Sequence, residues 1–215
     1  VGTRLDDYDS FGSHSSYSLG YAFAFAPAWT LGVQQGTGFK APSLEQLYGQ
    51  YGSTSLSPET NQSTEVFIQF QDGSTHVRSS LFQNRIANLI SANSTTFYYF
   101  NVDKVKIQGV SISAQTRFKD FNFQTSIDLL NPVYDSGANT GKQLSLRSKQ
   151  VMRLAVDKQF TLSKAGLEYQ YTGKRFDDAP NKVEFPAYGL VNIWTQTVLG
   201  QGWQWTNRID NLFDV

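Results

Sequence analysis

The stretch YSLGYAFAF, residues 17–25, alternates large and small side chains along its whole length. Its odd-numbered positions are tyrosine, leucine or phenylalanine, and its even-numbered positions are serine, glycine or alanine. Successive side chains of a β-strand point to opposite faces, so this period of two predicts a strand with one large apolar face and one small face. No segment of the chain keeps a helical period for more than a turn or two.

The same alternation recurs along the chain and predicts about eleven strands. Tight links and longer polar links alternate between these strands, which predicts an antiparallel meander with short turns at one rim and long loops at the other. Around Gly109 the apolar parity changes, and a β-bulge there would restore the facing. The expected strands are 2–8, 15–26, 29–38, 62–72, 75–90, 97–118, 121–131, 144–158, 165–175, 188–199 and 203–212.

Composition removes several classes of function. The 215 residues carry 18 basic and 18 acidic side chains, so no net positive charge indicates a nucleic-acid partner. The chain has no cysteine, which excludes disulfides, thiolate metal sites and cysteine nucleophiles. The two histidines, His14 and His76, are expected at opposite rims, so neither a metal pair nor a Ser-His dyad is predicted. The sequence therefore predicts a protein that is not an enzyme and holds no metal or cofactor.

A transmembrane β-barrel explains these strands better than a soluble β-sandwich. Many strands exceed about ten residues, which is enough to cross a bilayer when tilted. Aromatic residues cluster at strand ends, as in interfacial girdles. The polar faces of the other strands also carry charges that a dry sandwich core would reject, namely Arg78, Lys106, Arg117, Arg153 and Glu168.

The segment GTGFKAPSLEQLY, residues 36–48, has no third glycine and no following helix-plus-strand unit, so it is not a phosphate-binding turn. It resembles the segment of TonB-dependent outer-membrane receptors in which a late barrel strand ends and an extracellular loop begins. Four further pieces resemble that family in the same order: GTRLDDYDSFGSH (2–14), LSPETNQSTEVFIQF (56–70), FNVDKVKIQGVSISAQTRF (100–118) and RIDNLFDV (208–215).

The resemblance implies an all-β fold, in which residues 1–215 are the C-terminal part of the barrel domain. They would form about half of a twenty-two-stranded barrel, and the N-terminal plug, the TonB-contacting segment and the final strand are expected to lie outside the sequence. The implied function is active transport of a bulky ligand across the outer membrane of a Gram-negative bacterium. The implied partners are outer-membrane lipid and, through the plug, the TonB complex. The full-length barrel is expected to be monomeric.

Within the family, the chain resembles the vitamin B12 (cobalamin) transporters through RSKQVMRLAVD (147–157), GLEYQYTGKRFDD (166–178) and the loop LYGQYGS (47–53). Cobalamin is therefore the expected ligand. A siderophore receptor that takes up a ferric chelate is the alternative. Residues 40–64 contain no histidine, which argues against haem. A passive porin-like channel and a soluble β-sandwich binding module are the alternatives from other classes.

Ligand contacts are expected on the rim of long loops, where tyrosines offer flat amphipathic surfaces and arginine offers a positive charge. The opposing interpretation is that rim tyrosines anchor strands at the lipid headgroups. Neighbouring aspartates at 6–9 and 177–178 lack the spacing of a calcium loop. The candidate ligand-binding residues are Tyr48, Tyr51, Tyr98, Tyr99, Tyr134 and Arg147.

Overall fold

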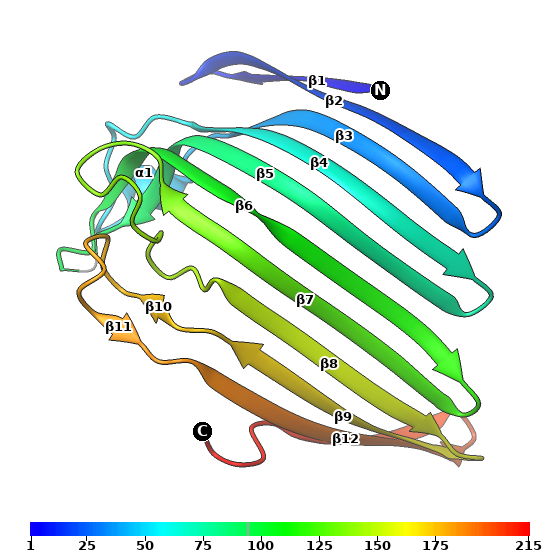
Figure 1. Cartoon of the computed structure of the whole chain (residues 1–215). Coiled ribbons are helices and arrows are strands. Elements are labelled where there is room, and N and C mark those ends of the chain that lie inside the picture. Colours follow the sequence, from blue (N-terminus) through cyan, green and yellow to red (C-terminus); the bar gives the residue numbers. More distant parts are fainter. Residues whose placement is uncertain (94) are drawn as a thin grey trace.

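The computed structural model describes residues 1–93 and 95–215, and it consists of one curved antiparallel sheet with long connections at one end (Figure 1). Eleven strands lie side by side in chain order, so the sheet is a meander as predicted. They are β1 (Gly2–Tyr8), β2 (Gly12–Ala26), β3 (Trp29–Lys40), β4 (Glu59–Asp72), β5 (Thr75–Ala92), β6 (Tyr99–Phe118), β7 (Phe121–Tyr134), β8 (Gln150–Gln159), β9 (Ser163–Thr172), β12 (Tyr188–Gly200) and β13 (Trp203–Ile209).

The connections divide between the two ends of the sheet. Five tight turns lie at one end, at residues 27–28, 73–74, 119–120, 160–162 and 201–202, and we call this end the turn rim (Figure 1). The long links 41–58, 135–149 and 173–187 lie at the other end, the loop rim, together with the described residues 93 and 95–98 of the link between β5 and β6. The link expected at 9–14 is a tight connection of residues 9–11 instead, because β2 begins at Gly12.

The two faces of the sheet differ in how well they are shielded. In β4 the odd-numbered residues from Asn61 to Gln69 are half-buried, and the even-numbered residues from Thr60 to Ile68 are exposed. In β5 the side chain of Ser80 is 6% exposed, whereas its neighbour Leu81 is 62% exposed. Side chains converge on the inner face of a curved sheet and diverge on its outer face. The Ser80 face is therefore concave and the Leu81 face convex.

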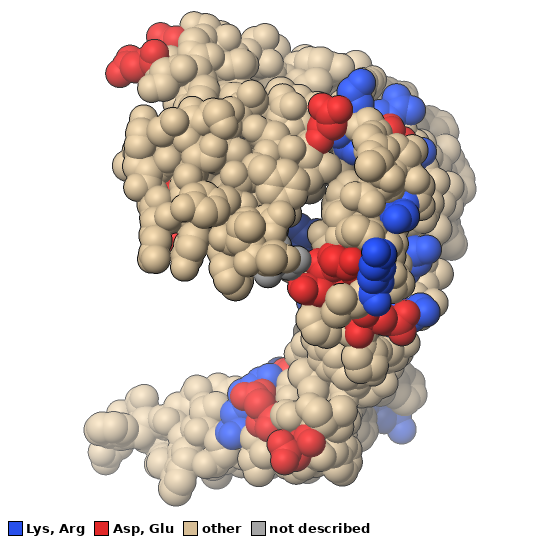
Figure 2. Space-filling view, turned by 90° about the vertical axis from the view of Figure 1, so that its left-hand side faces the viewer, with Lys and Arg blue, Asp and Glu red and all other residues tan. Residues whose placement is uncertain are grey.

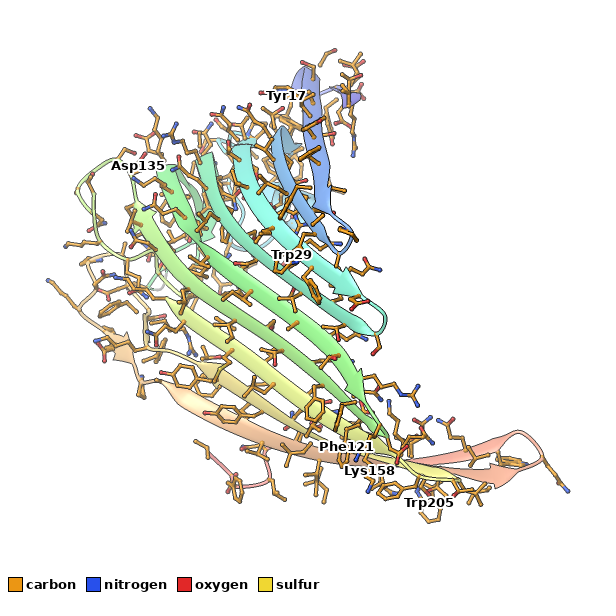
Figure 3. All side chains as sticks on the ribbon, turned by 45° about the vertical axis from the view of Figure 1, so that its right-hand side comes forward. Tyr17, Trp29, Phe121, Asp135, Lys158 and Trp205 are labelled. Atoms are coloured by element: carbon orange, nitrogen blue, oxygen red, sulfur yellow. The ribbon has the colours of Figure 1, made fainter. Side chains whose placement is uncertain are left out.

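The convex face is apolar across neighbouring strands. Tyr21 pairs with Val33, Val33 with Val66, and Val66 with Leu81, so one row of apolar side chains crosses β2 to β5. Strand pairing places cross-strand partners on the same face. The predicted outward parity of residues 17–25 agrees with this register, because Tyr21 lies in the row. Trp29, Phe121 and Trp205 lie toward the turn rim, and Asp135 lies at the loop rim (Figure 3).

The concave face carries a network of charged and amide side chains. Glu65 accepts hydrogen bonds from Arg78 and Gln34, both at 2.7 Å, and the Arg78 guanidinium lies 3.5 Å from the centre of the Phe67 ring. Further along the sheet, Glu168 pairs with Arg208 at 2.7 Å. Among the described residues the only other sheet is a small hairpin, so no second layer covers this face as it would in a sandwich.

The predicted bulge at Gly109 is wrong. Strands β5 and β6 keep one register from Tyr99 to Gln115, and β6 and β7 are also in continuous register. Val105 therefore stays on the concave face and Lys106 on the convex face, opposite to the sides expected from the sequence. The sequence pattern led to the wrong side because we took an apolar side chain as a sign of the lipid-facing side. Val105 is apolar because it is buried together with Tyr134 and Leu144 on the concave face.

Several strand ends also differ from the prediction. Residues 144–149 form an irregular loop that precedes β8. Leu144 is buried against Val105 and Tyr134, and the Ser148 hydroxyl donates to the carbonyls of Gln150 and Gly173. The strand expected at 165–175 is β9 followed by a separate short hairpin, β10 (Arg175–Phe176) and β11 (Glu184–Phe185). The loop after β3 contains a one-turn helix, α1 (Leu44–Tyr48), which the sequence did not predict. No helix of the described residues is long and apolar enough to cross a membrane.

Candidate ligand-binding rim

The loop rim gathers four long connections around the mouth of the concave face. Figure 2 looks onto this rim and shows a curled profile that is open along one side, with acidic and basic side chains along its edge. The charged residues come from several strands and loops, including the ion pairs Lys40–Glu59 at 3.2 Å, Lys106–Asp135 at 3.7 Å and Lys174–Glu184 at 3.0 Å. Charged groups of both signs therefore lie side by side along the loop rim.

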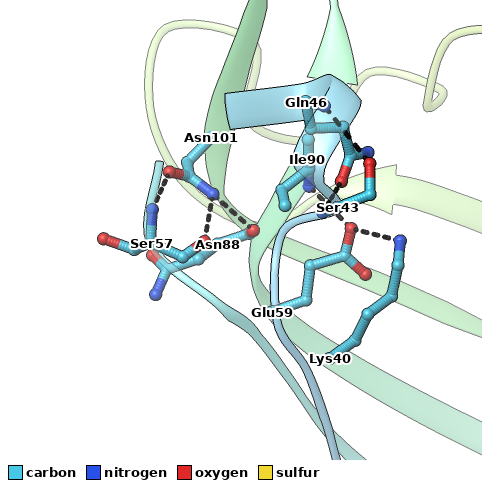
Figure 4. A network of polar contacts seen from close by, with 8 residues as sticks. All are labelled: Lys40, Ser43, Gln46, Ser57, Glu59, Asn88, Ile90 and Asn101. Carbon is cyan, nitrogen blue, oxygen red and sulfur yellow. Dashed lines mark hydrogen bonds and ion pairs between the residues drawn. The ribbon is translucent and has the colours of Figure 1, made fainter. Parts of the chain in front are cut away.

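The loop at residues 41–58 is tied at both ends to neighbouring strands (Figure 4). Ser43 and Gln46 form a capping box that starts α1. Glu59 accepts a hydrogen bond from the backbone N–H of Ile90 at 3.0 Å. Asn101 accepts from the backbone N–H of Ser57 at 2.8 Å, and its amide nitrogen donates to the carbonyls of Ser57 and Asn88. The loop therefore has a set position over β5 and β6.

An aromatic cluster joins this loop to the next one. The Tyr51 ring centre lies 5.8 Å from that of Phe97 and 5.8 Å from that of Tyr98, the latter in an edge-on arrangement. The backbone N–H of Tyr99 donates to the carbonyl of Tyr51 at 3.0 Å. The structure thus places two of the candidate residues, Tyr51 and Tyr98, in contact with each other. Tyr99 holds the two loops together through its backbone hydrogen bond. Tyr48 ends α1 and stands apart, with 69% of its surface exposed.

Tyr134 does not form part of an accessible site. It is only 5% exposed and packs with Val105 and Leu144. Its hydroxyl lies 3.0 Å from Ser145 Oγ. The side chain of Tyr134 therefore holds the loop at residues 135–149 against the sheet. Its role is structural, in contrast to the ligand contact that we expected from the sequence.

Loops 135–149 and 173–187 are joined by a reciprocal pair of hydrogen bonds. The Asn181 side chain accepts from the backbone N–H of Gln143 and donates to the Gln143 carbonyl, both at 2.8 Å. The Gln143 side chain in turn donates to the carbonyl of Arg147 at 2.6 Å. This fixes the backbone at Arg147, while its side chain remains exposed. Arg147 therefore combines an exposed side chain with a backbone whose position is set.

The hairpin formed by β10 and β11 shapes the last long loop. The Arg175 guanidinium lies 5.4 Å from the ring centres of Phe185 and Tyr188. The Asp178 carboxylate accepts hydrogen bonds from the backbone N–H groups of Val183 and Lys182, each at 2.8 Å. The bond from Val183 has the largest effect and lowers the pKa of Asp178 below its usual range, and the bond from Lys182 lowers it further. Burial acts in the opposite direction. The described residues contain no group of three or more metal-ligating side chains.

Sequence reasoning missed the residues that organise the rim. Phe97 extends the aromatic cluster, and the run FYY at residues 97–99 was a signal that could have included it. Asn101 and Asn181 have no such signal, because an asparagine near a strand end or in a loop is common and its partners are far away in sequence. His14 stacks on Phe39 at 3.7 Å near the loop rim, whereas His76 lies near the turn rim, as expected.

Comparison with solved structures shows the same fold. Over 98% of this chain, the structure matches a mutant of the ferric enterobactin receptor PfeA from Pseudomonas aeruginosa in complex with enterobactin, with a TM-score of 0.78 and 18% identity. The siderophore receptor PirA from Acinetobacter baumannii matches 99% of the chain with a TM-score of 0.77 and 20% identity. The unliganded ferric citrate transporter FecA matches with a TM-score of 0.75 and 16% identity over 99% of the chain.

The chain spans between 36% and 38% of the length of those three proteins. A family model, described as TonB dependent receptor-like, beta-barrel, matches residues 1–212 of the sequence. The match covers every strand of the sheet, and it agrees with the convex apolar face, the concave polar face and the separation of short turns from long loops. The chain therefore belongs to the family of TonB-dependent receptors and forms part of their β-barrel.

Proposed function

We propose that this chain supplies part of the wall and several external loops of an outer-membrane receptor that imports a bulky ligand. The observation that supports this most is the arrangement of the sheet: an apolar convex face suits lipid, and a polar concave face suits a water-filled or plugged lumen. The loop rim then faces outside the cell. Energy would come from the TonB complex, which would be contacted by residues outside this sequence, and no covalent chemistry on the ligand is involved.

For the ligand, we favour a ferric chelate of the siderophore class over cobalamin. Short pieces of the sequence led to the expectation of cobalamin. The similar structures are those of a ferric enterobactin receptor, siderophore receptors and a ferric citrate transporter, which supports the ferric chelate. The rim chemistry is compatible with this class, because aromatic rings can stack on an aromatic chelator and an arginine can attract an anionic one.

The proposed contacts are Tyr48, Tyr51, Tyr98 and Arg147, with Tyr99 in a supporting position. Tyr48 is exposed at the end of a helix whose start is fixed by a capping box, so a ligand can reach it without any rearrangement. Tyr51 and Tyr98 already contact each other, so a ligand would bind to the aromatic cluster as a unit. Substituting Tyr51 should therefore disturb two loops, whereas substituting Tyr48 should remove one contact only.

The test measures binding of a ferric catecholate chelate and of cyanocobalamin to the purified full-length receptor, by quenching of intrinsic fluorescence. We expect the ferric chelate to bind and Tyr48→Ala to raise its Kd by about tenfold, because losing one aromatic contact costs about 1–2 kcal/mol. Leu44→Ala, which removes an exposed non-aromatic side chain from the same helix, is the control and should change Kd by less than about twofold.

Three other results would change the proposal. Binding of cyanocobalamin alone would restore the first expectation of the ligand. Binding of neither ligand, together with steady ion conductance through the receptor in planar bilayers, would favour the passive channel. Uptake into cells that continues after loss of TonB would show that transport is not energised in the proposed way.

A further inference from the structure

Three cations lie on the convex face, on the loop-rim side of its apolar row and separated from that row by one row of uncharged polar side chains. In β5, Arg85 is four residues beyond Leu81 and so shares its face; it pairs directly with Lys106 of β6. Lys104 is two residues from Lys106 on the same face, opposite Ala87. We call these three residues the outward cation cluster. It could not be recognised from the sequence, because the expected bulge at Gly109 would have turned Lys106 to the other side.

The cluster lies at the height of lipid headgroups if the sheet crosses a membrane. Arg85 is about ten residues from the turn rim along β5, and about ten residues of a strand tilted by about 40° rise about 25 Å, the height of the apolar band in such barrels. Between the apolar row and the cluster lies a polar row that contains Thr64, Gln83 and Gln108. The outward surface thus changes from apolar to uncharged polar to cationic toward the loop rim.

The positive charge of the outward cation cluster is only partly neutralised by the described residues, so an anion from outside the chain would stabilise it. Like charges directly opposite each other on paired strands are destabilising, and Arg85 and Lys106 are such a pair. Asp135 offsets part of this charge, since its carboxylate lies 3.7 Å from the Lys106 ammonium. Within the described part of the chain, no carboxylate forms an ion pair with Arg85 or Lys104, and both side chains are exposed. A net positive charge therefore remains on this surface.

A cleft lies beside the cluster. Arg85, Lys104 and Asp135 line it together with Thr60 and Gln62, and its volume is about 710 Å³. Its other wall includes Tyr17 and His14 of β2, where β2 ends its pairing with β3 at Ser18. The cleft offers two cations and several hydroxyl and amide groups, and the apolar row lies on the same face, nearer the turn rim. This combination suits a phosphorylated headgroup whose acyl chains lie on the convex face.

We propose that the outward cation cluster binds the phosphate groups of an anionic lipid in the outer leaflet. Arg85 and Lys104 would contact the phosphates, and Lys106 would add charge while paired with Asp135. The inference rests on the proposed function, because it requires the convex face to be in lipid with the loop rim outside. It goes beyond transport, since it assigns an anionic lipid to the outer surface of β5 and β6 near the loop rim.

The test compares lipid retention by the purified full-length receptor in detergent, using bis-phosphorylated lipid A as the probe and phosphatidylethanolamine as the zwitterionic comparison. Native mass spectrometry counts the bound lipid as its concentration is raised. We expect Arg85→Gln/Lys104→Gln/Lys106→Gln to weaken lipid A binding by at least about tenfold, because each cation near a membrane surface contributes to anionic lipid attraction. Phosphatidylethanolamine should bind wild type and variant equally.

The matched control removes the same charge elsewhere: Lys142→Gln/Lys149→Gln/Lys182→Gln alters three exposed lysines that lie outside the strands. It should keep lipid A affinity within about twofold of wild type. Equal lipid A binding by wild type and the cluster variant would overturn the inference. Displacement of lipid A by millimolar inorganic phosphate would also overturn it, since the site would then be one for free phosphate.

A label at residue 81 separates this inference from the proposed function. If a spin label on Leu81→Cys reports acyl chains while the cluster variant still retains lipid A, only the lipid site is wrong. If the label reports water, the membrane orientation itself is wrong and the proposed function falls with it.

Discussion

At the scale of single residues, the concave face depends on close packing between a glycine and an aromatic ring. A Cβ atom at Gly32 would overlap the ring of Phe67 on the neighbouring strand. The same ring carries the Arg78 guanidinium, which pairs with Glu65. Gly32 therefore allows Phe67 to lie flat on the sheet and to support a charged pair above it. Aromatic cover of a strand glycine is a known way to stabilise sheets.

Replacing Gly32 should destabilise the sheet. We expect Gly32→Ala to lower the free energy of unfolding by about 1–3 kcal/mol, because the methyl group overpacks the site. Urea titration of the refolded receptor, followed by the heat-dependent shift in gel mobility, measures this. Gly20→Ala is the control, since its Cβ would lie 3.6 Å from that of Gln34, an ordinary contact. If Gly32→Ala costs the same in a Phe67→Ala background as in wild type, the ring is not the cause.

The turn at Asp178 should depend on pH. Its pKa is lowered in the folded loop, so the ionised carboxylate stabilises the turn. That contribution is complete above the usual aspartate pKa of about 3.9 and is lost as the pH falls through the lower, folded pKa. Amide exchange at Lys182 and Val183, corrected for the intrinsic pH dependence, should show protection that disappears in that acid range. Asp178→Asn keeps an acceptor oxygen and should give protection independent of pH; an identical pH dependence would contradict this explanation.

At the scale of elements, each strand presents two environments that alternate residue by residue. Strand β5 shows this over adjacent positions: Ser80 lies under the concave network and Leu81 projects from the convex face. The register with β4 and β6 is unbroken, so one slipped residue would exchange the two faces throughout the strand. The facing of β5 is therefore a strict test of the whole sheet.

Spin labels at these two positions should report different surroundings. In the full-length receptor in lipid bilayers, a label on Leu81→Cys should be more accessible to oxygen, which concentrates in acyl chains. A label on Ser80→Cys should be more accessible to a water-soluble nickel reagent, or to neither if its side is packed. The chain has no cysteine of its own, so the labels are specific within it. Equal accessibility profiles at both positions would contradict the assignment of the faces.

At the scale of the whole molecule, the sheet has two free edges. β1 and β13 each pair with one neighbour only among the described residues. In the meander these two strands run in the same direction, so joining them would require one parallel pair in an otherwise antiparallel sheet. An unpaired strand edge in lipid leaves backbone N–H and C=O groups without partners, which costs several kcal/mol for each group. The sheet therefore needs further strands before it can face lipid.

Residues 1–215 expressed alone should not form a stable monomeric barrel. We expect the refolded chain to aggregate in bilayers or detergent and to show no heat-dependent shift in gel mobility, whereas the full-length receptor shows one. Addition of the missing strands as a separate polypeptide should rescue the shift if edge pairing is the cause. A heat-sensitive monomer formed by residues 1–215 alone would show that the edges can be satisfied in another way.

The sequence by itself determined the path of the sheet. Alternation within residues 17–25, the Asp72-Gly73 turn and the placement of tight links predicted strands, facing and meander, because each depends on neighbours along the chain or across one turn. It also placed Tyr48 and Tyr51 in a long loop, and Tyr98 at the top of a strand, at one rim. These features could be predicted because strand facing repeats every two residues, whatever lies farther away.

Only the tertiary structure decided what the loops cover. Val105 and Ile107 seemed to require a bulge, yet they stay on the concave face because Leu144, far along the chain, folds over that surface. Tyr134 is buried by the same loop, and Lys106 consequently faces outward. An apolar side chain indicates that a position will be buried, but it does not indicate which segment will cover it. Loops are positioned by contacts with residues far along the chain, and no local pattern encodes those contacts.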